Sequence, residues 1–233
     1  MGSVRLPGKV MLGLCGKTVL ARVVERVRQS HCAGTLIVAT STQPGDEVIV
    51  DECRRLRVAC FRGSQNDVLD RCYRAALEAA ADVVVRICSD SPLTDPEVID
   101  KVVLGFLETK PDYTSNTLHR SYPLGLDVEV ITIRALRCCW KEARHAYQRS
   151  HVTPFVYDNP DRFKICHVIG EMDHSGHRWT LDTPEDYEFL GAIYSRMPDP
   201  DCFSWHDVLK LLDNEPELEE INQHIRQKEL QAG

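Results

Sequence analysis

The sequence predicts an α/β fold, with a mostly parallel, doubly wound sheet in a single domain. Apolar runs typical of buried strands alternate along the chain with segments whose apolar residues recur at helical spacing. The strand-like runs are short and continuously apolar, as expected for strands that helices cover on both faces. A chain of 233 residues with 43% hydrophobic residues is also long enough to bury a core of its own.

The alternation is clearest in the first half of the chain. Residues 18–30 place Val19, Val23 and Val27 on one face of a helix, and the apolar run at 35–41 follows as a buried strand. The same reasoning predicts a helix at 46–56, a strand at 58–63, a helix at 67–81, a strand at 82–90 and a helix at 95–109. Asp95 is the expected N-cap of this last helix, with Pro96 at its first position.

The rhythm loosens after about residue 110. We expect two extended segments around a loop at 112–133, a helix at 134–145, and a helix interrupted at Pro154 over 151–163. Further along, strands are expected at 164–170 and 177–182. A helix follows at 183–197, and an increasingly charged helical segment at 204–230. The expected organisation is one domain over residues 1–220, followed by a charged helical tail at 221–233.

Composition excludes several classes of protein. The chain has 28 Lys+Arg against 35 Asp+Glu, a net charge of −7, so a nucleic-acid partner is not expected. No apolar run approaches the roughly 18 residues of a membrane span, and no signal-peptide pattern opens the chain, so a cytoplasmic protein without a membrane partner is expected. The ten cysteines form no C-x-x-C pair, which favours reduced thiols over zinc or disulfides.

Polar residues follow the predicted strands where ligands of open α/β sheets bind, beyond the strands' carboxyl ends. Thr40 and Ser41 end one strand, Asp90 another, and Asp182 a third. A charge at the end of an apolar strand is costly unless something binds it. Asp90 and Asp182 are therefore candidate ligands for a hard cation such as Mg²⁺, which is held by one or two carboxylates plus substrate phosphates.

The first nine residues, MGSVRLPGK, are basic and rich in turn formers. Such a stretch is either a frayed terminus or a phosphate-binding loop. A phosphate-binding loop is usually held by a buried strand in front of it. Lys17, which precedes the first predicted helix, has the same two interpretations, surface lysine or phosphate ligand.

Seven segments of the sequence occur in the order seen in one enzyme family. They are residues 1–20, VATST at 38–42, FRGSQNDVLDR at 61–71, VVVRICSDSPLTDPEVID at 83–100, SNTLHRSYPLGLDVEV at 115–130, HVTPFVYDNPDRF at 151–163, and RWTLDTPEDYEFL at 178–190. In these the chain resembles the cytidylyltransferases of the spore-coat-polysaccharide type, relatives of the CMP-sialic acid and CMP-Kdo synthetases.

The resemblance implies a Rossmann-like sheet of the nucleotide-diphospho-sugar transferase type. It implies an enzyme that takes CTP and a sugar or sugar acid and releases a CMP-sugar and pyrophosphate, with Mg²⁺ as cofactor and a homodimer as a further expectation. Surface or spore-coat polysaccharide synthesis would use such a product. Two alternatives are a glycosyltransferase that consumes a nucleotide sugar, and a catalytically inactive nucleotide-binding paralogue.

The resemblance also assigns roles to individual residues. The N-terminal loop would wrap the triphosphate, with Arg5, Lys9 and Asp90 as catalytic groups and Asp90 and Asp182 as metal ligands. The nucleotide would contact Gly2, Ser3, Arg5, Gly8, Lys9, Thr40, Ser41, Ser64 and Ser89. Ser64 has a second interpretation as a helix N-cap, and Asp70 and Arg71 are expected to pair locally.

The expected acceptor-binding residues are Gly125, Asp127, Glu129, His151 and Arg178. Asp127 and Glu129 share one face of a strand and need a polar substrate or a basic neighbour, for which Arg178 is the candidate. His151 either caps a helix or touches the substrate.

Two departures from the family pattern stand out. Ser89 occupies a position where the relatives have glycine before the metal aspartate, so its side chain could crowd the nucleotide. The relatives also carry a hydrophobic strand before the methionine that is Met1 here. A sheet without that strand is expected to be marginally stable, with a mobile loop from Met1 to Lys9.

Overall fold

The computed structural model describes residue 2 and residues 5–227. Its first half comprises β1 (Gly13–Leu14), β2 (Lys17–Thr18), α1 (Val19–Arg28), β3 (Ile37–Ser41), α2 (Glu47–Leu56), β4 (Ala59–Gly63), α3 (Val68–Glu78), β5 (Val83–Arg86) and α4 (Pro96–Thr109). Its second half comprises β6 (Tyr113–Ser115), β7 (Glu129–Thr132), α5 (Ile133–Glu142), α6 (Ala146–His151), α7 (Pro154–Tyr157), β8 (Ile165–His167), α8 (Pro184–Arg196), α9 (Trp205–Asn214) and α10 (Glu217–Glu220). Short 3-10 helices lie at Lys9–Met11 (η1), Pro44–Asp46 (η2) and Pro160–Arg162 (η3).

The predicted helices start where their capping residues place them. The Asp95 carboxylate accepts a hydrogen bond from the Glu97 amide at 2.9 Å, which begins α4 as expected. Thr183 and Asp186 form a capping box at the start of α8. These local interactions explain why the helices could be located from the sequence.

The sheet differs from the prediction of a mostly parallel arrangement. β3 and β4 are parallel and form a two-stranded sheet, whereas the larger sheet is mixed, in the order β5-β7-β6-β8. In that sheet β7 is antiparallel to both β5 and β6, and β6 is parallel to β8. The loop at 116–128 returns the chain beside β6, a connection that an antiparallel pair allows without a crossover helix.

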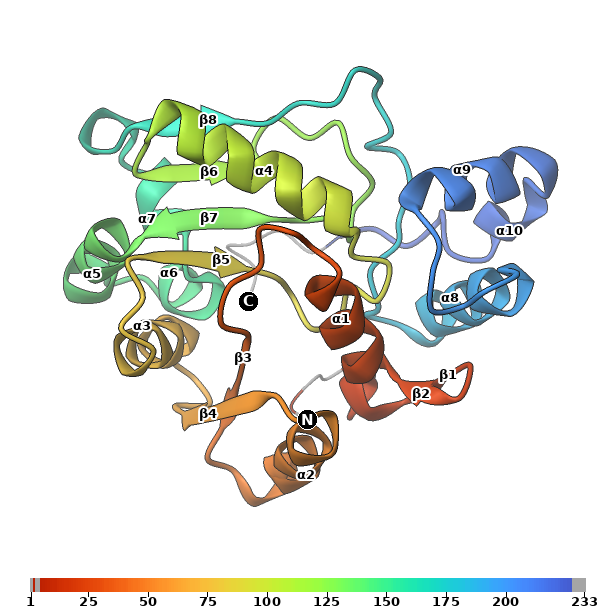
Figure 1. Ribbon diagram of the computed structural model, residues 1–233, viewed down its shortest axis with the longest axis horizontal. Coiled ribbons are helices and arrows are strands. Elements are labelled where there is room, and N and C mark those ends of the chain that lie inside the picture. Colours follow the sequence, from red (N-terminus) through yellow and green to blue (C-terminus); the bar gives the residue numbers. More distant parts are fainter. Residues whose placement is uncertain (1, 3–4, 228–233) are drawn as a thin grey trace.

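Helices cover both faces of the four-stranded sheet (Figure 1). Val130 of β7 packs in a cluster that includes residues of α4, while the next residue, Ile131, packs in a different cluster that includes residues of α5. Successive strand residues point to opposite faces, so β7 is buried on both. A third cluster joins α1 to α2.

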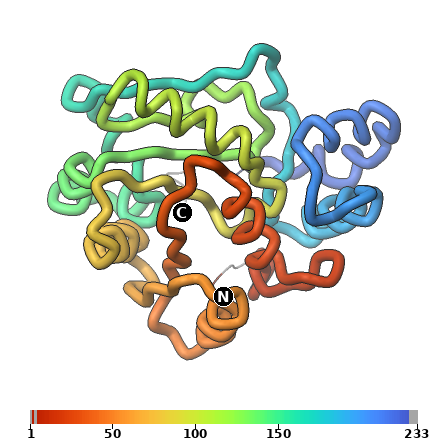
Figure 2. Tube along the Cα trace, viewed as in Figure 1, coloured from red at the N-terminus to blue at the C-terminus, as the bar shows by residue number. Residues whose placement is uncertain are grey.

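The N-terminal segment lies against the C-terminal part of the chain (Figure 2). The Tyr187 hydroxyl of α8 donates a hydrogen bond to the carbonyl of Gly13, which lies in the β1–β2 hairpin. The sequence analysis missed this hairpin, whose two-residue strands are too short to show a periodic pattern.

Two further expectations need correction. Residues 177–182 form no named strand and make only an isolated parallel bridge between Leu124 and Arg178. Beyond α10, residues 221–227 form turns and irregular backbone rather than a helix, and residues 228–233 lie outside the described residues. All ten cysteines are free thiols, as predicted. No helix in the described ranges is long and apolar enough to span a membrane.

Candidate active site

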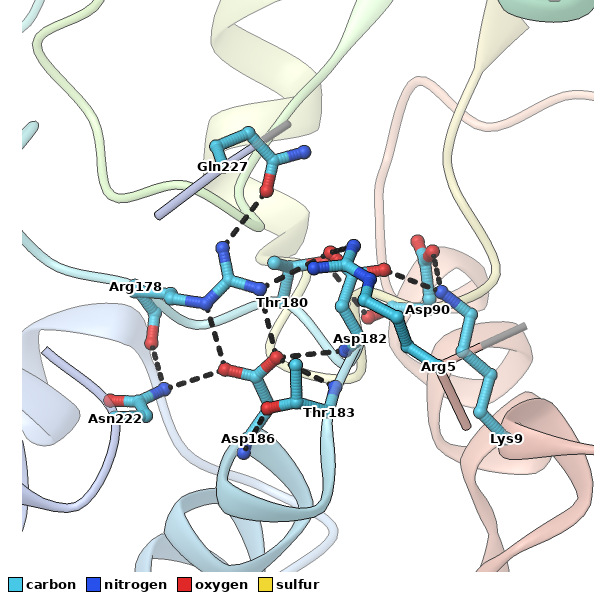
Figure 3. A network of polar contacts seen from close by, with 10 residues as sticks. All are labelled: Arg5, Lys9, Asp90, Arg178, Thr180, Asp182, Thr183, Asp186, Asn222 and Gln227. Atoms are coloured by element: carbon cyan, nitrogen blue, oxygen red, sulfur yellow. Dashed lines mark hydrogen bonds and ion pairs between the residues drawn. The ribbon is translucent and has the colours of Figure 1, made fainter. Parts of the chain in front are cut away.

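Two aspartates from distant parts of the chain converge on one cation. The Lys9 ammonium lies 2.5 Å from Asp90 Oδ2 and 2.8 Å from Asp182 Oδ1 (Figure 3). A backbone hydrogen bond holds the two aspartate-bearing segments together, because the Leu181 amide donates to the Asp90 carbonyl at 2.8 Å. The two carboxylates therefore lie together, although residues 177–182, expected as a strand, form only an isolated bridge.

Positive charge surrounds Asp182. Arg5 Nη2 lies 3.1 Å and Arg178 Nη2 3.2 Å from Asp182 Oδ2, in addition to Lys9 on the other oxygen. Burial alone would raise the pKa of Asp182, but Lys9, Arg5 and Arg178 together hold it below its usual value. Burial likewise would lower the pKa of Lys9, and the two aspartates raise it instead. The group is a charged, partly buried network at neutral pH.

Asp186 organises this network, and the sequence analysis gave it only a capping role. Its side chain is fully buried and pairs with Arg178, whose Nε and Nη2 lie 2.8 Å from its two oxygens. It also accepts hydrogen bonds from the amides of Asp182 and Thr183 and from Asn222 Nδ2. The capping box predicted the contact with Thr183, but nothing in the sequence pointed to Arg178 or Asn222 as partners.

A polar cavity of about 410 Å³ opens beside these groups, at the carboxyl ends of β3 and β4. Of the residues expected at the nucleotide, six line it: Gly2, Gly8, Lys9, Thr40, Ser41 and Ser89. Gln65, Asn66 and Arg71 also line it and were not predicted. Its size is within the range of about 300–1,000 Å³ typical of small-molecule sites.

The cavity wall at β3 is held rigid by Asp46. The hydroxyls of Thr40 and Ser41 donate to Asp46 Oδ2 at 2.7 and 2.6 Å, and the Ser41 amide donates to it at 2.9 Å. Burial would raise the pKa of Asp46, but these donors lower it well below its usual range. Both hydroxyls donate to this carboxylate, which fixes the orientation of Thr40 and Ser41 at the cavity wall.

Two described residues expected at the nucleotide, Arg5 and Ser64, are not among the lining residues. Arg5 pairs with Asp182, and the Ser64 hydroxyl accepts the Asp67 amide at 3.1 Å in the turn before α3, whose N-cap is Asp67 and not Ser64. Lys17 pairs with Glu25 and Asp201 at 2.8 Å each, on the surface and away from the aspartates. Ser3 lies outside the described residues. Asp70 and Arg71, expected to pair with each other, do not: Asp70 pairs with Arg74, and Arg71 donates to the Ser64 carbonyl.

The carboxylates of Asp127 and Glu129 have basic partners, but Arg178 is not one of them. Arg120 binds Asp127 through two hydrogen bonds of 2.6 and 3.0 Å, and Arg86 pairs with Glu129. Arg178 instead serves Asp182 and Asp186. The expected pairing with Arg178 was wrong because the spacing of residues in a sequence does not show which of several arginines lies next to a given carboxylate.

The half-buried thiol of Cys88 lies in the chain between Arg86 and Asp90. Arg86 lowers its pKa, while desolvation and the charges of Asp90, Glu129 and Asp127 raise it to about 12. His151 belongs to the same neighbourhood, since burial and Arg86 lower its pKa and Glu129 opposes them. At neutral pH His151 is therefore an uncharged hydrogen-bonding group.

Gly125 has a structural role. Its φ of +113° lies in a region that side chains rarely adopt, and an added Cβ would come within 2.7 Å of the Trp179 carbonyl carbon. This close approach lets the loop at 116–128 pack on residues 177–182. Gly125 thus allows the segments that carry Asp127 and Asp182 to pack closely together.

The carboxylate pair fits a magnesium ion that arrives with a phosphate-bearing substrate. One oxygen of Asp90 and one of Asp182 already contact a single cationic atom, Lys9 Nζ. Among the described residues, no group of three or more His, Cys, Asp or Glu side chains could hold a metal by itself. Two carboxylates completed by substrate phosphates are the usual arrangement for Mg²⁺.

Acid should destabilise the fold at the Asp186 network. Burial opposes the ionised form of Asp186, but Arg178 and Asn222 lower its pKa from the ordinary 3.8. Its contribution to stability is thus fully present above the unfolded pKa, about 3.9, and is lost as the pH falls through the lower folded value. Urea unfolding should show a free energy that declines between pH 5 and pH 3, with a shallower decline in Asp186→Asn. Equal slopes in the two proteins would contradict this assignment.

Comparison with known proteins places the chain in a family. The cytidylyltransferase family model matches residues 1–228. The spore coat polysaccharide biosynthesis protein SpsF of Bacillus subtilis is 30% identical over 93% of this chain and 92% of its own. A solved cytidylyltransferase of Leptospira borgpetersenii is 32% identical, covers 97% of this chain and 95% of its own, and superposes with a TM-score of 0.91.

A more distant structure shares the fold. CMP:2-keto-3-deoxy-manno-octonic acid synthetase, solved with CTP, is 15% identical, covers 84% of this chain and 95% of its own, and has a TM-score of 0.62. The α/β architecture is therefore the nucleotidyltransferase fold of that synthetase, with the small and mixed sheets described above. On the family match and the full-length relatives, this chain belongs to the cytidylyltransferase family of nucleotide-transferring enzymes.

Proposed function

We propose that this protein transfers CMP from CTP to a hydroxyl of a sugar or sugar acid, giving a CMP-sugar and pyrophosphate. The observation that carries the proposal is the convergence of Lys9, Asp90 and Asp182 at the edge of the 410 Å³ polar cavity. Cations and paired carboxylates at one mouth of a nucleotide-sized cavity suit a triphosphate and its metal. The relatives by sequence support the cytidine nucleotide.

The reaction asks the protein mainly to position groups and to neutralise charge. The acceptor oxygen forms a bond to the α-phosphorus, the bond from that phosphorus to the bridging oxygen breaks, and the hydroxyl proton leaves. Negative charge develops on the departing pyrophosphate. Lys9 lines the cavity, and Arg5 pairs with Asp182 beside Lys9, so both cations can neutralise that charge. Magnesium, held by Asp90 and Asp182, would supply further positive charge at the phosphates.

The Lys9 ammonium can pair either with the two aspartates or with a phosphate of the substrate. Without a substrate its ammonium neutralises the two aspartates, which would otherwise repel each other. Lys9 also lines the polar cavity, and its flexible four-carbon stem allows the ammonium to turn toward a phosphate. The same residue therefore stabilises the empty site and can join the substrate's triphosphate in the occupied one.

The acceptor would lie on the side of Asp127 and Glu129. Asp127 is partly exposed and paired with Arg120, so it presents an oriented acceptor to a sugar hydroxyl without an unpaired charge. Glu129 is buried and accepts from Arg86, Tyr113 and Thr153, so its part is to hold this wall in place. The arginines can in turn meet the carboxylate of a sugar acid. A relative named for spore coat polysaccharide biosynthesis supports a product destined for a surface polysaccharide.

The first test is nucleotide choice. Pyrophosphate release is measured with Mg²⁺ and a panel of sugars and sugar acids. CTP is expected to support it at least about tenfold better in kcat/KM than ATP, GTP or UTP, a difference of about 1.4 kcal/mol in transition-state free energy. Equal rates with all four nucleotides would contradict the proposal, as would no release with any acceptor.

Two lysines provide a matched control for that measurement. Lys9→Ala should weaken CTP binding in calorimetry, because it removes a cation at the cavity. Lys17→Ala removes the same charge from a surface pair with Glu25 and Asp201, so CTP should bind as it does to the parent protein.

A further inference from the structure

The stretch of residues 218–227, which we call the C-terminal segment, packs beside the candidate active site. Leu218 is buried in the largest hydrophobic cluster, and Ile221 packs against the same cluster. The carboxylate of Glu219 also forms a hydrogen bond with Nδ1 of His177. These contacts dock the segment without involving the charged groups of the site.

Asn222 joins this segment to both ends of the Arg178–Asp186 ion pair. It is 2% exposed, and its Nδ2 donates to the Arg178 carbonyl and to Asp186 Oδ1, at 3.0 Å each. A side-chain amide has two N–H donors, so both are used within this pair. Because Arg178 and Asp186 are themselves buried, Asn222 closes a ring of polar groups that has little access to solvent.

The Arg178 guanidinium is held on three sides (Figure 3). Nε and Nη2 donate to the two oxygens of Asp186, and Nη2 also reaches Asp182 Oδ2 at 3.2 Å. Nη1 donates to Gln227 Oε1 at 2.9 Å. Every nitrogen of the guanidinium therefore has a partner, and the C-terminal segment holds Arg178 at its backbone through Asn222 and at its tip through Gln227.

The orientation of Arg178 decides which oxygen of Asp182 is available in the site. Arg178 and Arg5 both contact Oδ2 of this aspartate. The other oxygen, Oδ1, is the one that meets Lys9 together with Asp90 Oδ2. A carboxylate that is held at one oxygen keeps the other directed into the site, which is how the partners of a metal ligand fix its orientation.

We infer that the C-terminal segment orients the candidate active site: Asn222 and Gln227 fix Arg178, and Arg178 fixes the Asp182 carboxylate. Neither Asn222 nor Gln227 is among the residues that line the polar cavity, so both are positioning residues. The effect on catalysis rests on the proposed function, whereas the orientation of Arg178 can be measured in the protein without substrate or metal.

The test compares three variants. Asn222→Ala removes both hydrogen bonds to the buried ion pair, and Gln227→Ala, at an exposed position, removes the partner of Nη1 without opening the core. Glu219→Ala is the matched control, because Glu219 belongs to the same segment but bonds to His177. One readout is hydrogen exchange at Arg178 Nε in the metal-free protein, with the signal assigned from Arg178→Lys. The others are kcat and KM for CTP.

Asn222→Ala should speed exchange at Arg178 Nε by at least about tenfold, because the guanidinium is freer to leave the buried pair. It should lower kcat by about 10–100-fold while KM for CTP stays within about threefold, since the residues that line the cavity are unchanged. Gln227→Ala should change exchange and kcat in the same direction by less, and Glu219→Ala should change neither. The melting temperature of Asn222→Ala should fall by about 2–12 °C, so exchange and turnover are measured well below it.

Exchange at the parent rate in both Asn222→Ala and Gln227→Ala would overturn the inference. Equal losses of kcat in Asn222→Ala and Glu219→Ala would overturn it too, because the segment would then matter only through its docking. If Asn222→Ala does not fold, Gln227→Ala decides the question through the exchange rate. If the parent protein releases no pyrophosphate from CTP, the proposed function fails, and the exchange rates still decide whether the segment orients Arg178.

Discussion

Asp90→Asn is expected to lower turnover by about 10²–10³-fold, the cost typical of removing one preorganised electrostatic group from a transition state. Its effect on folding should be small. The Asp90 side chain pairs only with Lys9 among the described residues, and partly exposed ion pairs contribute about 0–1 kcal/mol. The melting temperature should therefore change by no more than about 4 °C. Asp182→Asn should lose turnover similarly and more stability, because three cations surround Asp182.

The matched control is Asp161→Asn. Asp161 is an exposed aspartate in η3 with no ion pair among the described residues, so the substitution removes the same charge at a distance from the site. Turnover is measured across a magnesium titration. If Asp90→Asn keeps near-normal turnover when magnesium is limiting, Asp90 is not a metal ligand and the proposed role of the aspartate pair fails.

The largest loss of stability is expected from Asp186→Ala. The substitution leaves the Arg178 guanidinium buried with one carboxylate fewer and leaves the Asp182 and Thr183 amides without their acceptor. Removing one partner of a buried ion pair typically costs about 3–5 kcal/mol. At about 2–4 °C per kcal/mol, the melting temperature should fall by roughly 6–20 °C. Turnover at a temperature where the variant is folded should fall too, since Arg178 no longer has a fixed orientation toward Asp182.

The chain contains a second capping box that serves as the control. Ser204 and Asp207 cap α9 as Thr183 and Asp186 cap α8, but the Asp207 side chain is 45% exposed and has no arginine partner among the described residues. Asp207→Ala should therefore cost only the capping contribution, about 0.5–2 kcal/mol. Equal losses for the two variants would show that Asp186 acts merely as a cap. A double variant, Asp186→Leu with Arg178→Met, should recover part of the lost stability, because no charge is then left unpaired.

Local rules explain what the sequence predicted about the fold. Helices such as α4 and α8 were located because their caps are encoded within three or four residues. Strand pairing was not, because β5 and β7 read alike whether they lie parallel or antiparallel. Residues 177–182 show the same limit. Their apolar pattern resembles a strand, yet their backbone is held by the Asp90 and Leu124 carbonyls instead of a ladder.

The candidate site was predictable where a strand end dictates position. Asp90 follows β5, as that rule requires, whereas Asp182 follows a segment that only resembles a strand and is held by the Asp90 and Leu124 carbonyls. The family resemblance added Arg5 and Lys9. Which arginine pairs with which carboxylate could not be predicted, because the sequence does not distinguish Arg86, Arg120 and Arg178. Their assignment depends on distances set by the packing of α4, β7 and the loop at 116–128, and these emerge only in three dimensions.

The bond between Lys9 and Asp182 joins residues 173 positions apart, which bears on how the protein is made. A ribosome adds about 5–20 residues per second, so roughly 9–35 seconds separate the synthesis of the two residues. The helix and strand pairs between residues 19 and 63 can form from nearby contacts during that interval, since local contacts form first. The basic N-terminal loop, by contrast, emerges long before the carboxylate that holds it. The candidate site is therefore completed late in synthesis, after the helix and strand pairs of residues 19–63 have had time to form.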